Sequence, residues 1–87
     1  MRIHEVKIDE QWWSRIATGT KTCELRKNDR DYQTGDTLKF EGYAQTFEIT
    51  HILNAEQCDG LKEGYVILSL KPLKFSIFKA TPYSVTE

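Results

Sequence analysis

The sequence has few cysteines and no segment of the kind that usually binds a metal or enters a membrane. Its two cysteines, Cys23 and Cys58, lie far apart and have no histidine at zinc-ligand spacing, so neither a metal site nor a cofactor is expected. In a reducing compartment such a pair favours two buried thiols over a disulfide. No apolar run approaches the roughly 20 residues of a membrane span, and the opening segment MRIHEVKIDE has no apolar signal core. We therefore expect a cytoplasmic protein without a membrane partner.

A large excess of charge is also missing. The formal net charge is -1 at pH 7, which argues against general affinity for nucleic acid but leaves room for a local basic patch. With 87 residues the chain is long enough for one small domain and too short for two. We expect this domain, a monomer or weak dimer, over residues 1–73. In the C-terminal extension, residues 74–87, the stretch FSIF is a candidate edge strand that precedes a loose tail.

Hydrophobic periodicity predicts a mainly β fold. Alternating or continuous apolar residues favour strands over residues 3–8, 20–28, 37–43, 45–53 and 65–70, and a helical pattern covers residues 10–18. The polar segment 54–64 is long enough for one further helical turn. Five or six short strands with one or two short helices predict an α+β fold built as a small closed or nearly closed β-barrel. Closing the sheet into a barrel removes its exposed edges, and so short a chain has few other segments that could cover them.

The expected helix has recognisable ends and one apolar face. Asp9 is placed to cap the first turn, because a carboxylate there accepts hydrogen bonds from free backbone N–H groups. Gly19 follows the helix and supplies the left-handed residue that commonly ends one. Trp12, Trp13 and Ile16 cluster at helical spacing. At least one of the two tryptophans is therefore expected to pack against the barrel.

The strand expected over residues 20–28 is rich in charge. Its alternation assigns Cys23 and Leu25 to the barrel interior and leaves Glu24 and Arg26 outside or beneath the helix. A charged strand face is most often solvated, and an exposed Glu–Arg pair is often a weak surface ion pair. Same-face neighbours lie roughly 7 Å apart, so Glu24 and Arg26 can also hold one bound group between them. Lys21 stands at the entrance of this strand.

The later strands and the histidines are interpreted as structural. The strand over residues 45–53 is expected to place four residues on one face: Phe47, Ile49, His51 and Leu53. A lone histidine on such a face, here His51 and also His4, is more often a hydrogen-bonded core residue than a ligand. The segment 65–70 is apolar enough to be buried on both faces. The segment RKNDRD, residues 26–31, is interpreted as a turn with local ion pairs.

Several segments resemble a known family. The stretch GTKTCELR, from Gly19 to Arg26, resembles the G-x-K-x-x-E-x-R motif of the ASCH domain, a member of the PUA-like β-barrel superfamily. The stretches HEVKI, ELRKNDRDYQTGDTL and LKEGYVILSL are similar to a small bacterial and phage branch of that superfamily that is catalogued as a domain of unknown function. The resemblance runs from about His4 to Pro72. It implies a PUA-like barrel.

The resemblance also implies a ligand and a place for it. Members of the superfamily bind RNA or a nucleotide-like ligand in a cleft between helix and barrel, and the motif positions that would line it are Lys21, Glu24 and Arg26. Lysine meets a phosphate as a point charge, and arginine as a planar fork. A carboxylate accepts from an exocyclic amine of a base. Trp12 or Trp13, whichever is not buried, is a candidate stacking platform, and Lys27 or Arg30 could contact a backbone phosphate.

One branch of the ASCH proteins is enzymatic. Its N4-acetylcytidine amidohydrolases resemble this sequence through a K-x-x-T pattern, in which the lysine activates a threonine hydroxyl as nucleophile and a downstream glutamate assists. Lys21 is kept here, but Glu24 occupies the position of that threonine, which argues against an enzyme. A carboxylate at Glu24 could still activate water, with Glu63 as its downstream partner. A third alternative is a phage-type accessory protein that uses the barrel as a scaffold for protein interactions.

Overall fold

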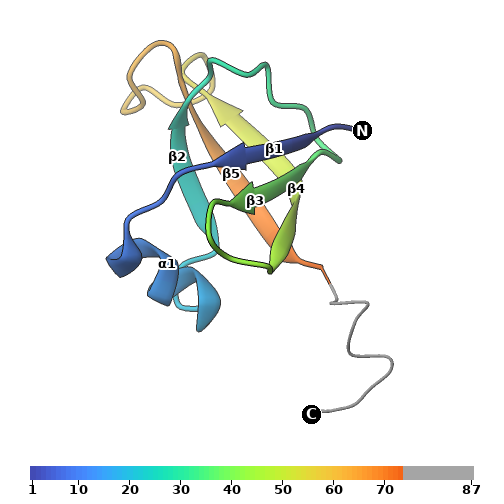
Figure 1. Cartoon of the computed structure of the whole chain (residues 1–87). Helices are drawn as coiled ribbons and strands as arrows, with labels where there is room; N and C mark the ends of the chain where they lie inside the picture. Colours follow the sequence, from blue (N-terminus) through green and yellow to red (C-terminus); the bar gives the residue numbers. More distant parts are fainter. Residues whose placement is uncertain (74–87) are drawn as a thin grey trace, which may run out of the picture.

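The computed structural model describes residues 1–73 and contains five strands and one helix within them. The elements are β1 (Ile3–Val6), α1 (Glu10–Ala17), β2 (Cys23–Lys27), β3 (Thr37–Phe40), β4 (Thr46–Asn54) and β5 (Tyr65–Pro72). The strands form one sheet in the order β1-β3-β4-β5-β2, and this sheet curls into a half-barrel (Figure 1). The expectation of a small, mainly β fold with a short helix is confirmed. The candidate edge strand FSIF lies outside the described residues.

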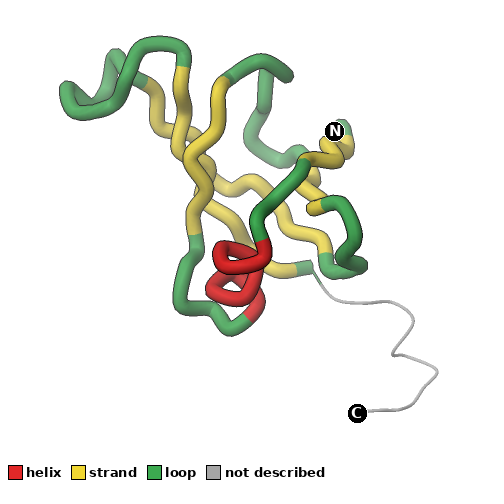
Figure 2. Tube along the Cα trace, turned by 60° about the vertical axis from the view of Figure 1, so that its left-hand side comes forward, coloured by secondary structure: helices red, strands yellow, loops and turns green. Residues whose placement is uncertain are grey.

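The strand pairing leaves the half-barrel open along one side. β3, β4 and β5 are antiparallel neighbours, β2 adds antiparallel to β5, and β1 adds parallel to β3. β1 and β2 are therefore the two edge strands, and within residues 1–73 they do not pair with each other. The helix α1 lies at one end of the half-barrel, and the loops after β2 and β4 lie at the other (Figure 1 and Figure 2).

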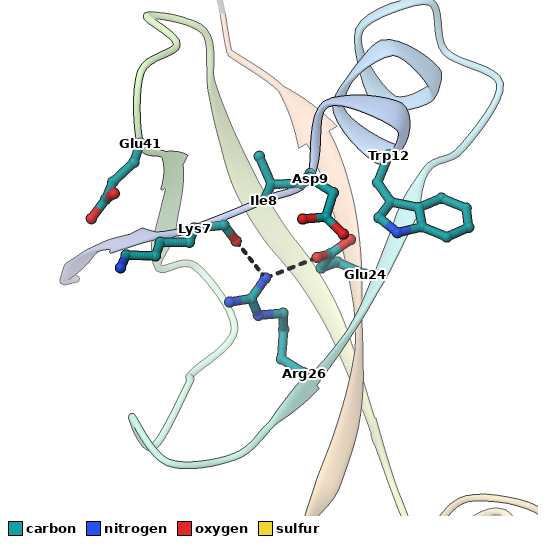
Figure 3. Close-up of a pocket in the computed structure, with 7 residues that line it drawn as sticks. All are labelled: Lys7, Ile8, Asp9, Trp12, Glu24, Arg26 and Glu41. Carbon is teal, nitrogen blue, oxygen red and sulfur yellow. Dashed lines mark hydrogen bonds and ion pairs between the residues drawn. The ribbon is translucent and has the colours of Figure 1, made fainter.

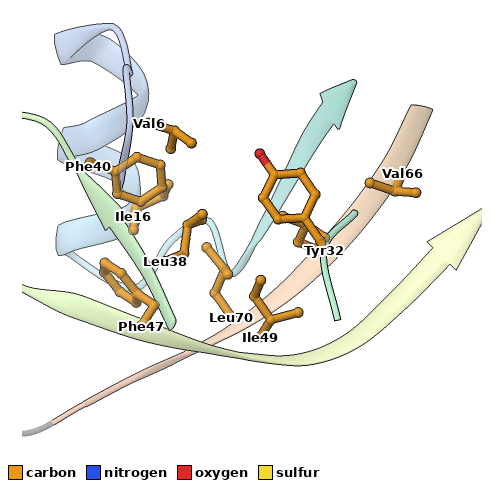
Figure 4. Close-up of a cluster of buried hydrophobic side chains, with 10 residues drawn as sticks. Val6, Ile16, Tyr32, Leu38, Phe40, Phe47, Ile49, Val66 and Leu70 are labelled. Carbon is orange, nitrogen blue, oxygen red and sulfur yellow. The ribbon is translucent and has the colours of Figure 1, made fainter. Parts of the chain in front are cut away.

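The hydrophobic core fills the inside of the curled sheet (Figure 4). Leu38, Phe40, Ile49 and Leu68 are fully buried there. Ile16 of α1 packs against this cluster and closes one end of it. Each large aliphatic or aromatic side chain buried in this way contributes roughly 1.5–3 kcal/mol to folding. The core thus fixes the helix against the end of the half-barrel.

The two tryptophans of α1 have different surroundings. The Trp13 ring stacks on Tyr43 with ring centroids 4.0 Å apart and meets Phe40 edge-on at 5.9 Å. Trp12 remains 39% exposed. The prediction that at least one tryptophan packs against the sheet is confirmed by Trp13, and Trp12 is left on the surface beside β2.

The ends of α1 agree with only one of the two expectations. Asp9 occupies the N-cap position with extended backbone, but its side chain makes no capping hydrogen bond, so the predicted carboxylate cap is wrong. The backbone oxygen of Asp9 instead accepts from the N–H groups of Trp12 and Trp13, each at 3.0 Å. At the other end Gly19 has a φ of 83° and donates its N–H to Ile16, as expected for a residue that ends a helix.

β2 is turned the opposite way from the sequence-based expectation. Glu24 is buried, whereas Cys23 is exposed and Leu25 exposes 57% of its surface. The assignment of Cys23 and Leu25 to the interior is wrong, and so is the burial of both thiols, since Cys58 is also only half-buried. The inner side of this edge strand faces the open side of the half-barrel, where two cations neutralise Glu24. An apolar side chain is therefore not required there.

A β-bulge in β4 changes which of its residues face the core. The register with β5 shifts between Ile49 and His51, so that Thr50 is the extra residue. Ile49 is buried, His51 is exposed and Leu53 pairs with Ile67 on the outer side. The expectation that His51 and Leu53 share the face of Ile49 is therefore wrong. A bulge is set by backbone geometry that simple alternation does not reveal.

Three further expectations are corrected or qualified. β5 alternates between buried and half-buried residues along 65–70, so it is not buried on both faces. The segment 55–64 forms turns without a helix. In the segment 26–31, the first two residues belong to β2 and only 28–31 form a loop, so the predicted turn is shorter than expected; no ion pair of the described chain joins two members of the segment. In residues 1–73 the one helix is too short to cross a membrane.

Candidate functional site

Three charged side chains meet at the inner side of β2. The Glu24 carboxylate accepts a hydrogen bond from Lys21 Nζ at 2.6 Å through one oxygen and from Arg26 Nη1 at 2.9 Å through the other. Only 9% of the Glu24 side chain is exposed, against 26% for Lys21 and 23% for Arg26. We call this cluster the Glu24 triad. The sequence-based expectation that these three residues come together is met in the structure, with the carboxylate at the centre.

Arg26 also connects the two edges of the half-barrel. Its Nη1 donates to the backbone oxygen of Lys7 at 3.0 Å, and Lys7 lies just after β1 (Figure 3). β2 and the segment that follows β1 are therefore joined by a side chain where the sheet makes no backbone pair. Lys21 is held at the other end, since its Nζ also donates to the backbone oxygen of Cys23. The Glu24 triad is thus part of the fold as well as a charged surface.

A cleft opens beside the triad. It has a volume of about 500 Å³ and is lined by residues from the β1–α1 connection, α1, β2 and the turn after β3 (Figure 3): Lys7, Ile8, Asp9, Trp12, Glu24, Arg26 and Glu41. We call it the triad cleft. Its volume is in the range of small-molecule sites. The helix forms one wall, as the resemblance implied.

Trp12 separates the triad cleft from a second hollow. The second hollow has a volume of about 450 Å³, and Trp12 and Glu24 line both spaces. The guanidinium of Arg15 lies 4.9 Å from the centroid of the Trp12 ring. This contact is favourable because a cation is attracted to the face of an aromatic ring. It also holds a partly exposed ring at the rim of the cleft.

The lining of the triad cleft is mixed in charge. Two basic residues, Lys7 and Arg26, stand among three acidic ones, Asp9, Glu24 and Glu41. Glu24 is neutralised within the triad. The carboxylates of Asp9 and Glu41 make no ion pair with any residue of the described range 1–73. The cleft therefore offers hydrogen-bond acceptors as well as cations, and it is not a strongly positive surface.

Lys21 bonds Glu24 but lines the second hollow and not the triad cleft, so the expectation that all three triad residues line one cleft is wrong for Lys21. Three further residues that the sequence suggested lie away from both the triad and the triad cleft. Lys27 pairs with Tyr65 and points to the outer side of the sheet, opposite to Arg26. Arg30 is exposed in the loop between β2 and β3 and does not line the cleft. Glu63 lines a different hollow, beside Asn28 and Gly64. The triad and Trp12 are therefore brought together, while these three residues are not.

Sequence reasoning missed the acidic lining residues and a buried pair. Glu41 adjoins a turn and Asp9 was assigned to helix capping, so neither carried a signal for ligand binding. His4 Nε2 and Asp36 Oδ2 lie 2.8 Å apart in the core. His4 is a hydrogen-bonded core residue as expected, but its acidic partner is distant in sequence. Only the parallel pairing of β1 with β3, which places the two chain segments side by side, brings them together.

The Asp36 carboxylate is firmly held in its ionised form. The hydrogen bond with His4 is the largest influence and lowers the pKa of Asp36 to about 2, although burial acts to raise it. The backbone N–H groups of Arg2 and Gln33 add hydrogen bonds, each at 3.1 Å. This carboxylate therefore fixes the start of β1 to the loop that precedes β3.

Tyr32 connects this pair with the triad. Its ring meets His4 edge-on, with centroids 4.8 Å apart. Burial is the main influence on the pKa of Tyr32 and raises it, while the positive charges of Arg26 and Arg30 oppose that rise. Arg26 is thus close to both Glu24 and the tyrosine.

Within residues 1–73 there is no group of three or more His, Cys, Asp or Glu residues that could hold a metal ion.

Known proteins share parts of this sequence and its architecture. A family model described as "Domain of unknown function (DUF3850)" matches residues 3–70. An uncharacterised 12.9 kDa protein in the GpA 3′ region of Escherichia phage P2 is 41% identical over 44 residues. This match spans 51% of the chain and 40% of the phage protein, so most of that protein has no counterpart in the matched segment.

Two solved structures resemble the fold. The hypothetical protein PH0355 is similar with a TM-score of 0.63 and 20% identity, over 84% of this chain and 100% of the other. The protein PF0455 from Pyrococcus furiosus is similar with a TM-score of 0.55 and 18% identity, over 86% of this chain and 100% of the other. At these levels of identity the similarity is one of fold alone.

Proposed function

The chain belongs to the family described as a domain of unknown function, DUF3850, and from this premise we propose that it is a small module that binds RNA or a nucleotide-like ligand in the triad cleft. The observation that carries the proposal is the cleft itself, where a partly exposed Trp12 stands beside the Glu24 triad. The finer assignment to the ASCH branch of the PUA-like superfamily is part of the same proposal. It is supported by the motif that supplies Lys21, Glu24 and Arg26.

Trp12 provides the stacking surface in this proposal. Its ring is 39% exposed at the rim of the cleft. Stacking of a base on an aromatic side chain contributes ~1–3 kcal/mol and tolerates different bases. The Arg15 guanidinium at 4.9 Å keeps the ring in place, which lowers the conformational entropy lost when a ligand binds.

The acidic residues that read the base are Asp9 and Glu41 rather than Glu24. Both oxygens of Glu24 already accept hydrogen bonds from cations, so a base amine has to displace one of them. Asp9 and Glu41 line the same cleft without an ion pair within residues 1–73. Their carboxylates can accept hydrogen bonds from an exocyclic amine. We therefore revise the expected role of Glu24 from reading a base to positioning Arg26.

The basic residues give only a modest affinity for phosphate. Lys7 lines the cleft, and Arg26 keeps N–H groups beyond the one that bonds Glu24 and Lys7. The neighbouring carboxylates offset their charge. The salt dependence of binding reflects the number of phosphates contacted, so we expect weak binding and a slope close to that of one phosphate contact.

A titration of the full chain tests the proposal. Cytidine, adenosine, their 5′-monophosphates and a short single-stranded RNA are added to isotope-labelled protein at low and at moderate salt. We expect amide shifts of residues around Trp12, Glu24 and Arg26, and roughly tenfold weaker binding of the Trp12→Ala variant, within the range of one stacking contact. If no nucleoside, nucleotide or RNA binds at low salt, the proposed function is wrong.

A pair of lysine variants provides the control. Lys7→Ala removes a cation from the cleft, whereas Lys27→Ala removes one from the opposite side of the sheet. Both changes alter the net charge equally. We expect only Lys7→Ala to weaken binding of a 5′-monophosphate and to flatten its salt slope. Equal effects of the two variants would show that binding reflects overall charge and not the cleft.

The same samples test the amidohydrolase alternative. Glu24 stands where the resembling enzymes have a threonine nucleophile, and its carboxylate is held by two cations. We therefore expect no efficient hydrolysis of N4-acetylcytidine, followed by mass spectrometry. Turnover that disappears in Lys21→Ala would make the protein an enzyme.

A further inference from the structure

The outer side of the sheet carries an apolar surface that the triad cleft does not use. Register places Leu25 of β2 beside Ile67 of β5, and Ile67 beside Leu53 of β4. Directly paired residues on neighbouring strands point to the same side. The next residues along β5, Val66 and Leu68, are buried in the core, so the row from Leu25 to Leu53 points outward. Leu25 is 57% exposed, and the other two are half-buried.

Two hollows extend this row on either side of Leu25. One is the second hollow of about 450 Å³, which Leu25 and Ile67 line together with Cys23. The other has a volume of about 230 Å³ and is lined by Leu25, Leu61 and Tyr65. Leu25 therefore forms a ridge between two mostly apolar depressions. We call the whole surface the outer patch and define it as Leu25, Leu53, Leu61, Tyr65 and Ile67.

The fold does not explain why β2 exposes a leucine. A half-exposed side chain on an edge strand contributes little to the core, and an apolar edge strand is a hazard for aggregation. β2 has the reverse of the usual pattern, because Glu24 points inward and Leu25 points outward. The bulge at Thr50 adds to the surface, since it turns Leu53 outward beside Ile67. Two independent local features thus enlarge one apolar surface.

The rim of the outer patch is positive. Lys21 and Lys62 line the two hollows, and Lys27 is paired with Tyr65 along the sheet. Lys62 Nζ lies 5.6 Å from the centroid of the Tyr65 ring. Glu24, the one acidic residue that lines either hollow, pairs with Lys21, so the positive charge of the rim comes from Lys62 and Lys27, which make no ion pair within residues 1–73. An apolar surface framed by lysines complements an apolar segment flanked by carboxylates.

We propose that the outer patch docks a segment of another protein that presents apolar side chains flanked by aspartate or glutamate. A second copy of this chain fits less well, because a two-fold contact would place one lysine-framed surface against another of the same charge. Nucleic acid fits less well because the row at the centre of the patch, Leu25, Ile67 and Leu53, is aliphatic, and the aromatic rings of Tyr65 and Trp12 stand only at its margins. Residues 74–87 contain Lys74 and Lys79 but only one acidic residue, Glu87, so their charge has the same sign as the rim.

A labelled peptide serves as the probe for this surface. The peptide alternates leucine and glutamate and carries fluorescein, and a matched peptide has lysine in place of each glutamate. Both are titrated against the full chain by fluorescence anisotropy, with amide shifts to locate the contact. We expect the acidic peptide to bind, to shift the outer patch and β2, and to bind more weakly as salt rises. The basic peptide should bind at least tenfold more weakly.

Surface variants separate the patch from general stickiness. Leu25→Ser removes the ridge, and Ile3→Ser removes an apolar side chain that is 69% exposed on the other edge strand, β1. Because both side chains are exposed, both variants should keep the stability of the parent. We expect Leu25→Ser to weaken binding of the acidic peptide about tenfold, a typical effect of removing an anchoring side chain. Ile3→Ser should leave that binding unchanged. Lys62→Glu should reverse the preference between the two peptides.

Each other result contradicts the proposal. Equal binding of the two peptides, equal effects of the two serine variants, or no binding of the acidic peptide would each show that the patch does not recognise an acidic segment. Concentration-dependent dimers that Leu25→Ser abolishes would identify a second copy as the occupant. If single-stranded RNA but neither peptide shifts the amide resonances of the outer patch, nucleic acid is its occupant. Shifts of residues 74–87 caused by Leu25→Ser without any peptide would identify the chain's own extension.

Discussion

Replacing Glu24 with glutamine should destabilise the fold well beyond an ordinary surface substitution. Glu24→Gln keeps the size of the side chain but removes the charge that two cations share. The Glu24 side chain is 9% exposed, and its carboxylate accepts from Lys21 and Arg26 at 2.6 and 2.9 Å. Hydrogen bonds to charged groups contribute about 1.5–3 kcal/mol each. The neutral variant also leaves two like charges close together.

The expected loss is smaller than the sum of both bonds. The amide of glutamine still accepts one hydrogen bond, and the cations are about a quarter exposed, at 26% and 23%, so they can turn to water. We expect a loss of about 2–3 kcal/mol in the free energy of unfolding, since removing one partner of a fully buried ion pair costs roughly 3–5 kcal/mol. For a domain of this size that loss lowers Tm by roughly 10–20 °C.

Thermal and urea unfolding monitored by circular dichroism measure this loss. Glu41→Gln is the matched control, because Glu41 lines the same cleft but is exposed and makes no ion pair within residues 1–73. The difference between the two variants should persist in 1 M salt, since salt screens buried pairs much less than exposed ones. If Glu24→Gln and Glu41→Gln unfold at the same temperature, or if salt removes the difference, the Glu24 triad is a surface ion pair and our reasoning about β2 is wrong.

Three further predictions concern stability and exposure. The pKa of Asp36 is lowered to about 2 from its ordinary value of 3.8, so its contribution to stability is complete above about pH 5 and falls as the pH decreases to 2. Urea unfolding at stepped pH should show this decline, and an Asp36→Asn variant whose stability falls with pH as steeply as that of the parent would contradict the assignment to Asp36. Trp13→Ala should lower the free energy of unfolding by roughly 3 kcal/mol, the lower end of the range for buried aromatic residues, because Trp13 is partly buried against the core. The exposed Trp12→Ala should cost less than ~1 kcal/mol, and equal losses in denaturation curves would contradict the packing of the helix through Trp13. Cys23 is exposed and Cys58 half-buried, so mass spectrometry should find alkylation first at Cys23, and the reverse order would contradict the orientation of β2.

The sequence predicts the elements of this fold better than it predicts their faces. Periodicity locates the five strands and the helix that the structure describes in residues 1–73, and Gly19 ends the helix as expected. It fails at β2, because alternation reports which residues share a side but not which side faces the core. The apolar Leu25 suggested an inward side, whereas the ion pairs of Glu24 with its neighbours made the opposite orientation favourable.

The candidate site was predictable only in part. Lys21, Glu24 and Arg26 were found through a motif, and they do meet in the structure. Asp9 and Glu41 come from two separate connections, and only tertiary structure brings them to one cleft. The pair of His4 and Asp36 likewise depends on the parallel pairing of β1 with β3. Local sequence has no signal for such contacts because it does not specify which strands become neighbours.

The position of β2 at the sheet edge determines the order in which the site assembles. β3, β4 and β5 follow one another along the chain and pair as consecutive hairpins, whereas β2 joins β5 only after the chain has closed a long loop. Loop closure costs conformational entropy before any contact compensates for it. β2 is therefore expected to dock late in folding and to detach early in local unfolding. Amide hydrogens of β2 should exchange with solvent faster than those of β4, and a ligand bound beside Glu24 would slow that exchange because it binds only the assembled edge.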